Sequence, residues 1–251
     1  MPPAITSWRP DPTGDPRLTR VQPLLLSAIA GAVDCIGFMS LKLFTAHITG
    51  NLVVIAILLV RGGPPTLDQV LSVPIFILAT AGAWFIATIV PKRGAALARV
   101  LLSVQLLLLI CVWIFSVFTR PDTAPRGLSA DIAALMAISS MACQYVLLQL
   151  AMPGAPSTAV MTGNVAKAVL ALLDVRLGSN SIPLVRDAER PLNRSLALVV
   201  VFFLGCVGGA VAFLWRGDWA WLLPVVLAAL ALAVYPSGSS HEHPEGHAIM
   251  R

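Results

Sequence analysis

The sequence predicts an all-α, polytopic membrane helix bundle with two related halves and six to eight membrane segments. Three observations lead to this prediction. Hydrophobic residues make up 57% of the 251-residue chain and charged residues only 12%, whereas soluble domains carry about 25% charge. Apolar runs of about 20 residues, long enough to cross a bilayer, follow one another along the chain. The triplet Thr-Gly-Asn occurs twice, each time at the head of an apolar run.

Eight apolar segments are predicted to form helices, separated by connections rich in glycine, proline and charge. They cover residues 22–41, 45–60, 70–90, 97–118, 131–151, 157–174, 195–215 and 218–235. Six of them are long enough to cross a hydrocarbon core of about 30 Å at about 1.5 Å per residue. The two that contain the triplets, 45–60 and 157–174, are shorter, so each either crosses as a short helix or re-enters the membrane.

These segments divide into two predicted repeats, residues 21–119 and 127–235. The polar stretches at the ends, residues 1–20 and 236–251, are expected to be disordered. Residues 1–20 are rich in proline and lack an apolar core, so no cleavable signal peptide is predicted. Eight crossings would make the halves a parallel repeat and six would make them an inverted repeat. Both kinds of repeat occur in transporters.

The duplicated triplet is the main candidate for a solute-binding element. The copies are 113 residues apart and consist of Thr49, Gly50 and Asn51 and of Thr162, Gly163 and Asn164. Glycine permits a break in a helix, threonine can cap one, and asparagine offers donors and an acceptor that lipid does not satisfy. A broken helix with free N–H groups can bind an anionic solute group. The alternative is that these residues only hold helices together.

Asp34 and Gln144 complete the predicted solute-binding set. Asp34 lies 15 residues before the first triplet, and Gln144 lies 18 residues before the second, so the two positions correspond only loosely. A carboxylate inside a membrane costs several kcal/mol unless it is paired, hydrated or protonated. Asp34 is therefore either a coupling or solute-binding group or a structural hydrogen-bond acceptor. His47 is a second coupling candidate if it meets Asp34, and otherwise an interfacial histidine.

Other functional classes lack support in the sequence. A nucleophile elbow, a phosphate-binding loop and an HExxH motif are all absent, so no enzyme is predicted. The four cysteines are far apart and form no CxxC motif, so neither a metal site nor a disulfide framework is predicted. No cofactor and no nucleic-acid partner is expected. The expected partners are the lipid bilayer and an unidentified small solute, and the sequence leaves homo-oligomerisation open.

The residues around the first triplet resemble the YoaK-like family of uncharacterised bacterial membrane proteins, a domain of unknown function. The resemblance is carried by Asp34 with Gly37-Phe38, then Phe44 and His47 with the triplet, and by Gln144 before the second triplet. It extends over about residues 20–235. It implies a multi-pass protein of the bacterial inner membrane but supplies no substrate.

The sequence favours transport of a small solute, with or without proton coupling, at a site formed by Asp34 and the two triplets. The alternative is a non-transporting scaffold, sensor or assembly protein whose polar residues only join helices. An enzyme that acts on membrane substrates ranks third.

Both termini are predicted to lie in the cytoplasm, because lysine and arginine accumulate on that side of a membrane. With Lys167 left out as intramembrane, 11 of these residues lie on the side of the N-terminus and 5 on the other, for six or for eight crossings. Reporter fusions near Arg17 and after Arg251 should both give cytoplasmic signals. A periplasmic signal from either end would contradict this topology.

Overall fold

A computed structural model describes residues 18–90, 95–119, 128–152, 161–177 and 189–235, and these residues form helices and their connections, without any strand. The helices are α1 (Leu18–Leu41), α2 (Ile48–Val60), α3 (Leu67–Ile89), α4 (Ala95–Thr119), α5 (Leu128–Leu150), α6 (Met161–Leu177), α7 (Glu189–Arg216), the 3-10 helix η2 (Gly217–Trp221) and α8 (Leu222–Val234). Each predicted apolar segment corresponds to one α-helix, which confirms the all-α fold. Residues 18–20 already belong to α1; the rest of the predicted disordered ends lies outside the described residues.

The long apolar helices make this a multi-pass membrane protein. Within the described residues, five stretches are long and apolar enough to cross a membrane: Val21–Leu41, Leu67–Ile89, Ala95–Thr119, Leu128–Leu150 and Asn193–Val234. The last of them contains both α7 and α8, joined by η2. Helix α2 has only 13 residues and therefore extends about 20 Å, which is less than the thickness of a hydrocarbon core.

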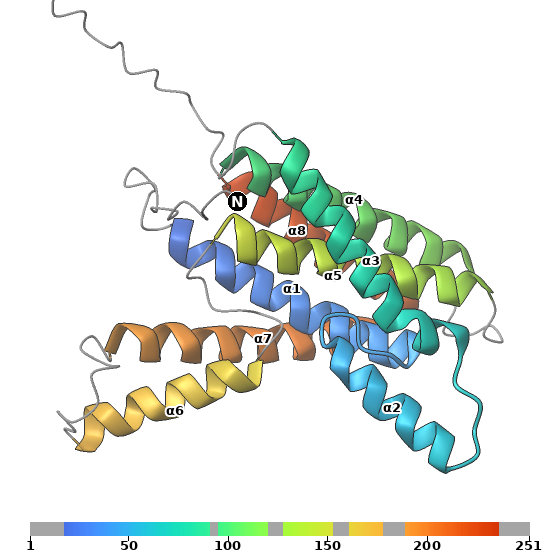
Figure 1. Ribbon diagram of the computed structural model, residues 1–251, viewed down its shortest axis with the longest axis horizontal. Helices are drawn as coiled ribbons and strands as arrows, with labels where there is room; N and C mark the ends of the chain where they lie inside the picture. Colours follow the sequence, from blue (N-terminus) through green and yellow to red (C-terminus); the bar gives the residue numbers. More distant parts are fainter. Residues whose placement is uncertain (1–17, 91–94, 120–127, 153–160, 178–188, 236–251) are drawn as a thin grey trace, which may run out of the picture.

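The long helices alternate in direction (Figure 1). Helices α1, α4 and α7 run one way through the bundle, and α3, α5 and α8 run the opposite way. Helices α2 and α6 leave the bundle on the same side and diverge from one another. The first helices of the two predicted halves, α1 and α5, are therefore antiparallel.

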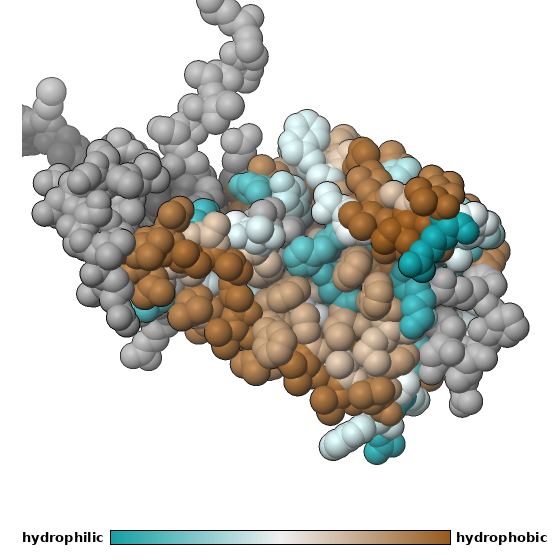
Figure 2. Space-filling model, turned by 90° about the horizontal axis from the view of Figure 1, so that it is seen from below, coloured by the Kyte–Doolittle hydropathy of each residue, from teal (hydrophilic) through white to brown (hydrophobic). Residues whose placement is uncertain are grey.

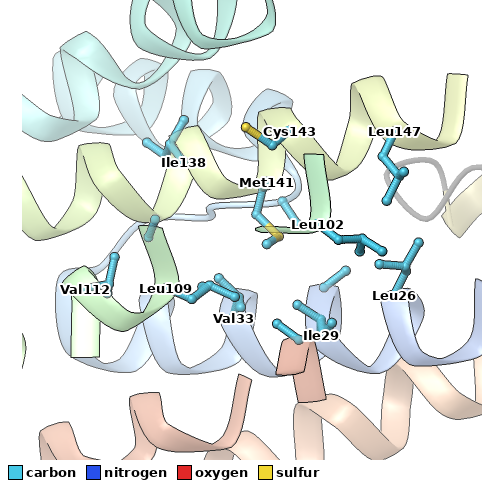
Figure 3. Packing of buried hydrophobic residues seen from close by; sticks show 14 of the residues in the cluster. Leu26, Ile29, Val33, Leu102, Leu109, Val112, Ile138, Met141, Cys143 and Leu147 are labelled. Carbon is cyan, nitrogen blue, oxygen red and sulfur yellow. The ribbon is translucent and has the colours of Figure 1, made fainter. Parts of the chain in front are cut away.

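Helices from the two predicted halves pack against one another. Helix α1 packs most extensively on α7 and α8, and α5 packs most extensively on α4 and α3. Helix α2 packs on α3, and α6 packs on α7. Figure 3 shows the centre of the bundle, where Leu26 and Val33 of α1 face Leu102 and Leu109 of α4 and Met141 of α5. In a bilayer such contacts are stabilised by close van der Waals packing.

The outer surface carries many large apolar side chains. Ile77 and Leu78 on α3 and Phe203 and Leu214 on α7 are each exposed over more than half of their surface. Figure 2 shows hydrophobic residues over much of the face seen from below, interrupted by hydrophilic residues toward one side. Such a surface suits contact with lipid chains, because lipid, unlike water, imposes no cost on exposed apolar groups.

The closest helix contact is between α1 and α7. The small-xxx-small spacing of Gly205 and Gly209 predicts close packing, and a Cβ at Gly205 would overlap the backbone carbonyl of Ala28. On the other helix, a Cβ at Gly31 would overlap the carbonyl of Phe202. The Ser27 hydroxyl donates a hydrogen bond of 2.8 Å to the carbonyl of Leu198. The two backbones therefore touch directly along this contact.

A glycine-to-alanine pair tests this contact. Gly31→Ala should destabilise the folded protein by about 1–3 kcal/mol, because the new methyl group has no room against Phe202. Gly82→Ala is the matched control, because nothing lies within 4 Å of a Cβ at Gly82. It should be neutral or stabilising by up to about 1 kcal/mol. Unfolding midpoints in detergent provide the measurement, and equal midpoints for the two variants would contradict the packing described.

Candidate functional site

The candidate site begins where the chain reverses after α1. Lys42 has a φ of 58°, in the left-handed region that commonly ends a helix, and its N–H donates to the carbonyl of Phe38 at 3.1 Å. Residues 43–47 then run back alongside α1 and lead into α2. We call residues 43–47 the returning segment. This reversal brings the start of α2 to the level of Asp34, two turns before the end of α1.

The Asp34 carboxylate holds the returning segment in place. Its Oδ1 accepts backbone N–H bonds from Thr45 at 2.8 Å, Ala46 at 2.6 Å and His47 at 3.4 Å, and a hydroxyl bond from Thr45 at 3.3 Å. Its Oδ2 forms an ion pair with Nδ1 of His47. These N–H groups lie just before the first turn of α2, where a helix has free donors and a partial positive charge. Asp34 thus places a negative charge where an anion would bind.

His47 meets Asp34, which is the condition that its role as a coupling candidate requires. Its side chain is 27% exposed. The ring also lies edge-on to Phe202 of α7, with 5.3 Å between ring centroids and 74° between planes. His47 lies outside the five membrane-spanning stretches, and the hydrogen bond that it donates to the Asp34 carboxylate raises the pKa of His47 above its ordinary value. The pair therefore favours a protonated imidazole beside a carboxylate.

The first triplet joins α2 to the returning segment. Asn51 is fully buried; its Nδ2 donates to the carbonyl of Phe44 and its Oδ1 accepts from the N–H of Phe44, both at 2.8 Å. A Cβ at Gly50 would come within 2.7 Å of the Phe44 ring, which explains the glycine. Phe44 in turn stacks on Phe38 at 4.9 Å. Thr49 is exposed, so it is the triplet side chain that remains accessible.

The second triplet repeats this order of burial in the first turn of α6. Thr162 is exposed, Gly163 is half-buried and Asn164 is buried. The Nδ2 of Asn164 donates a 3.8 Å contact to the sulfur of Met161. Residues 153–160 lie outside the described residues. Helices α2 and α6 diverge from the ends that carry the two triplets.

Gln144 lies in a different part of the interior from Asp34. Its Oε1 accepts from Nε2 of Gln105 at 2.8 Å, and its Nε2 donates to the carbonyl of Leu26 at 2.9 Å. Gln144 thus links α5 to α4 and α1. Leu26 precedes Asp34 by two turns of α1, about 12 Å along the helix axis. Asp34 and His47 are brought together, whereas Gln144 has its own network.

Sequence reasoning missed two contributors to the site. The donors to Asp34 are largely backbone N–H groups, which residue types do not reveal. Phe202 lies in an apolar helix and had no signal that set it apart from its neighbours. Phe44 did carry a signal, because it forms part of the family resemblance. Among the described residues, no group of three or more histidine, cysteine or acidic side chains is arranged to hold a metal ion.

Comparison with known proteins defines the family. A family model described as a protein of unknown function, DUF1275, matches residues 22–234. The chain belongs to the DUF1275 family. This match confirms the family resemblance predicted from Asp34, Gln144 and the two triplets. No curated protein and no solved structure matches the chain, so membership of the DUF1275 family supplies no substrate, and the function rests on the geometry of the site.

Alanine substitutions within the first triplet test which residue is structural. Asn51→Ala should destabilise the protein by about 1–3 kcal/mol, because it leaves the buried N–H and carbonyl groups of Phe44 without their partners. Thr49→Ala should change stability by no more than about 0.5 kcal/mol, because Thr49 is exposed. Thermal unfolding in detergent compares the two variants. An equal loss of stability in both would contradict the role assigned to Asn51.

Proposed function

We propose that this protein moves a small solute across the bacterial inner membrane, and that its two halves form an inverted repeat. Antiparallel α1 and α5 support the inversion (Figure 1). The packing supports the repeat, because contacts occur in corresponding pairs: α1–α7 matches α5–α3, α1–α8 matches α5–α4, and α2–α3 matches α6–α7. The shared burial order of the triplets agrees with this.

In this proposal the chain crosses the membrane six times, and α2 and α6 are re-entrant half-helices. The termini lie in the cytoplasm. Non-helical backbone at membrane depth is tolerated only where protein covers it or water reaches it. The returning segment lies beside the last two turns of α1, and exposed Thr49 and partly exposed His47 adjoin it. A water-accessible route past the first turns of α2 and α6 would hydrate these groups and carry the solute.

The single observation that carries the proposal is the Asp34 carboxylate bound to the N–H groups ahead of α2, with His47 as its partner. Two groups this close share protons as a pair. When Asp34 takes up a proton, its hydrogen bonds to Thr45 and Ala46 weaken, because a neutral carboxyl is a poorer acceptor than a carboxylate. The returning segment is then free to move, and α2 with it. Proton uptake is thereby coupled to opening of the route.

One observation favours the alternative, a non-transporting scaffold or sensor. Asp34 and Asn51 already use their hydrogen-bonding capacity within the protein. A purely structural role would need nothing more from them. The two functions differ in what removal of the Asp34 charge does, which gives the following test.

Asp34→Asn and Asp34→Ala separate the two functions. Asparagine keeps the acceptor for the N–H groups of Thr45 and Ala46 but cannot carry a proton. Asp34→Asn should therefore retain most of the folded yield and lose pH-driven solute flux in reconstituted vesicles tested against a broad solute panel. Asp34→Ala should lower the folded yield, because it leaves those N–H groups without an acceptor.

Asp68→Asn is a matched control, because Asp68 is a buried carboxylate at the start of α3, where Thr66 and Gln69 bind it. It should leave the pH dependence of flux intact. Unchanged pH-driven flux in Asp34→Asn would end the coupling proposal. Absence of flux for the wild-type protein over the whole panel would favour the scaffold.

A further inference from the structure

His47 is held between two helices from different halves of the chain. Asp34 of α1 binds its Nδ1, and Phe202 of α7 contacts its ring edge-on at 5.3 Å. Edge-to-face ring pairs of this kind are a preferred packing geometry at centroid distances of about 4.5–7 Å. The ring of Phe202 therefore restricts the rotation of the imidazole and keeps Nδ1 of His47 directed at Asp34.

Phe202 lies at the close contact between α1 and α7. The carbonyl of Phe202 lies against Gly31, which has no side chain to separate the backbones. One turn earlier, Ser27 binds the carbonyl of Leu198, and one turn later Gly205 meets Ala28. A shift of α7 relative to α1 must therefore move the Phe202 ring relative to His47.

The electrostatic surroundings of His47 are simple. The titratable partner of His47 on α1 is Asp34. Asp34 in turn interacts electrostatically with two thiols, Cys35 on α1 and Cys206 on α7. Thiols carry little charge at neutral pH. Helix α2 has no ionisable residue from Ile48 to Val60. Asp34 is thus the one charge among the described residues that is placed to act on His47, and Phe202 is its non-ionic partner.

We infer that Phe202 is a positioning residue that orients His47 toward Asp34 and makes protonation of the pair depend on the position of α7. This inference rests on the proposed function, in which the pair carries the coupling proton. It adds the link between the halves: proton binding in the first half responds to a helix of the second. When α7 shifts, His47 loses its aromatic contact and the pair gives up its proton more readily.

The test is the titration of His47, measured by NMR on histidine-labelled full-length protein in lipid nanodiscs. His47→Gln identifies the His47 signal among those of the tail residues His241, His243 and His247. Phe202→Leu should lower the titration midpoint of His47 by on the order of half a pH unit, because an imidazole free to rotate holds its ion pair with Asp34 less tightly. Phe202→Tyr keeps the ring and should keep the midpoint.

Phe203→Leu is the matched control, because Phe203 is 64% exposed on the same helix and should leave the midpoint unchanged. If Phe202→Leu folds poorly, Phe202→Met removes the ring but fills the space with a flexible, unbranched side chain, and it should lower the midpoint similarly. A wild-type midpoint in a folded variant without the ring would overturn the inference, and so would an equal shift in Phe203→Leu. Failure of the coupling proposal would be seen in a different experiment, as pH-driven vesicle flux that persists in Asp34→Asn.

Discussion

Asp34 places a negative charge inside a helix bundle that lipid surrounds, and the first half of the molecule is arranged around satisfying it. The charge is met by three backbone N–H groups, a threonine hydroxyl and His47. Those donors converge only if the chain turns back after α1 and starts α2 at the level of Asp34. Without the carboxylate, the same N–H groups would lie in the membrane without partners, which costs several kcal/mol. The Asp34 carboxylate and the returning segment therefore stabilise each other.

The two halves satisfy their polar groups differently. In the first half, a carboxylate, a histidine and the bidentate contact of Asn51 with Phe44 fix the start of α2. In the second half, helix α5 carries the neutral amide Gln144, which joins α4 and α1. The buried polar groups of the first half thus include a carboxylate, whereas this network of the second half rests on an amide. The α1–α7 contact, where glycine brings the backbones together, joins the first half to the second.

Much of this fold follows from sequence because length and polarity determine which segments enter a bilayer. The eight segments, the glycine contact at Gly205 and the importance of Asp34 and Asn51 could all be predicted. The charge count could not choose between six and eight crossings, because it gives the same ratio for both. The partners of Asp34 are largely backbone N–H groups, and the left-handed backbone conformation of Lys42 positions them. Phe202 is one aromatic residue among many apolar ones. Such contacts depend on three-dimensional packing, which residue types alone do not encode.

The most direct test of the account is the side of the membrane on which α2 ends. If Asp34 holds α2 as a re-entrant helix, Gly63 lies on the same side as Lys42, outside the cell; if α2 crosses, Gly63 is cytoplasmic. In a chain with its four native cysteines replaced, Gly63→Cys should react with a membrane-impermeant thiol reagent in intact cells, as the positive control Lys42→Cys should. Ala95→Cys, at the start of α4, should stay protected until the cells are opened. A protected Gly63→Cys with a reactive Ala95→Cys would show that α2 crosses the membrane and would contradict the account.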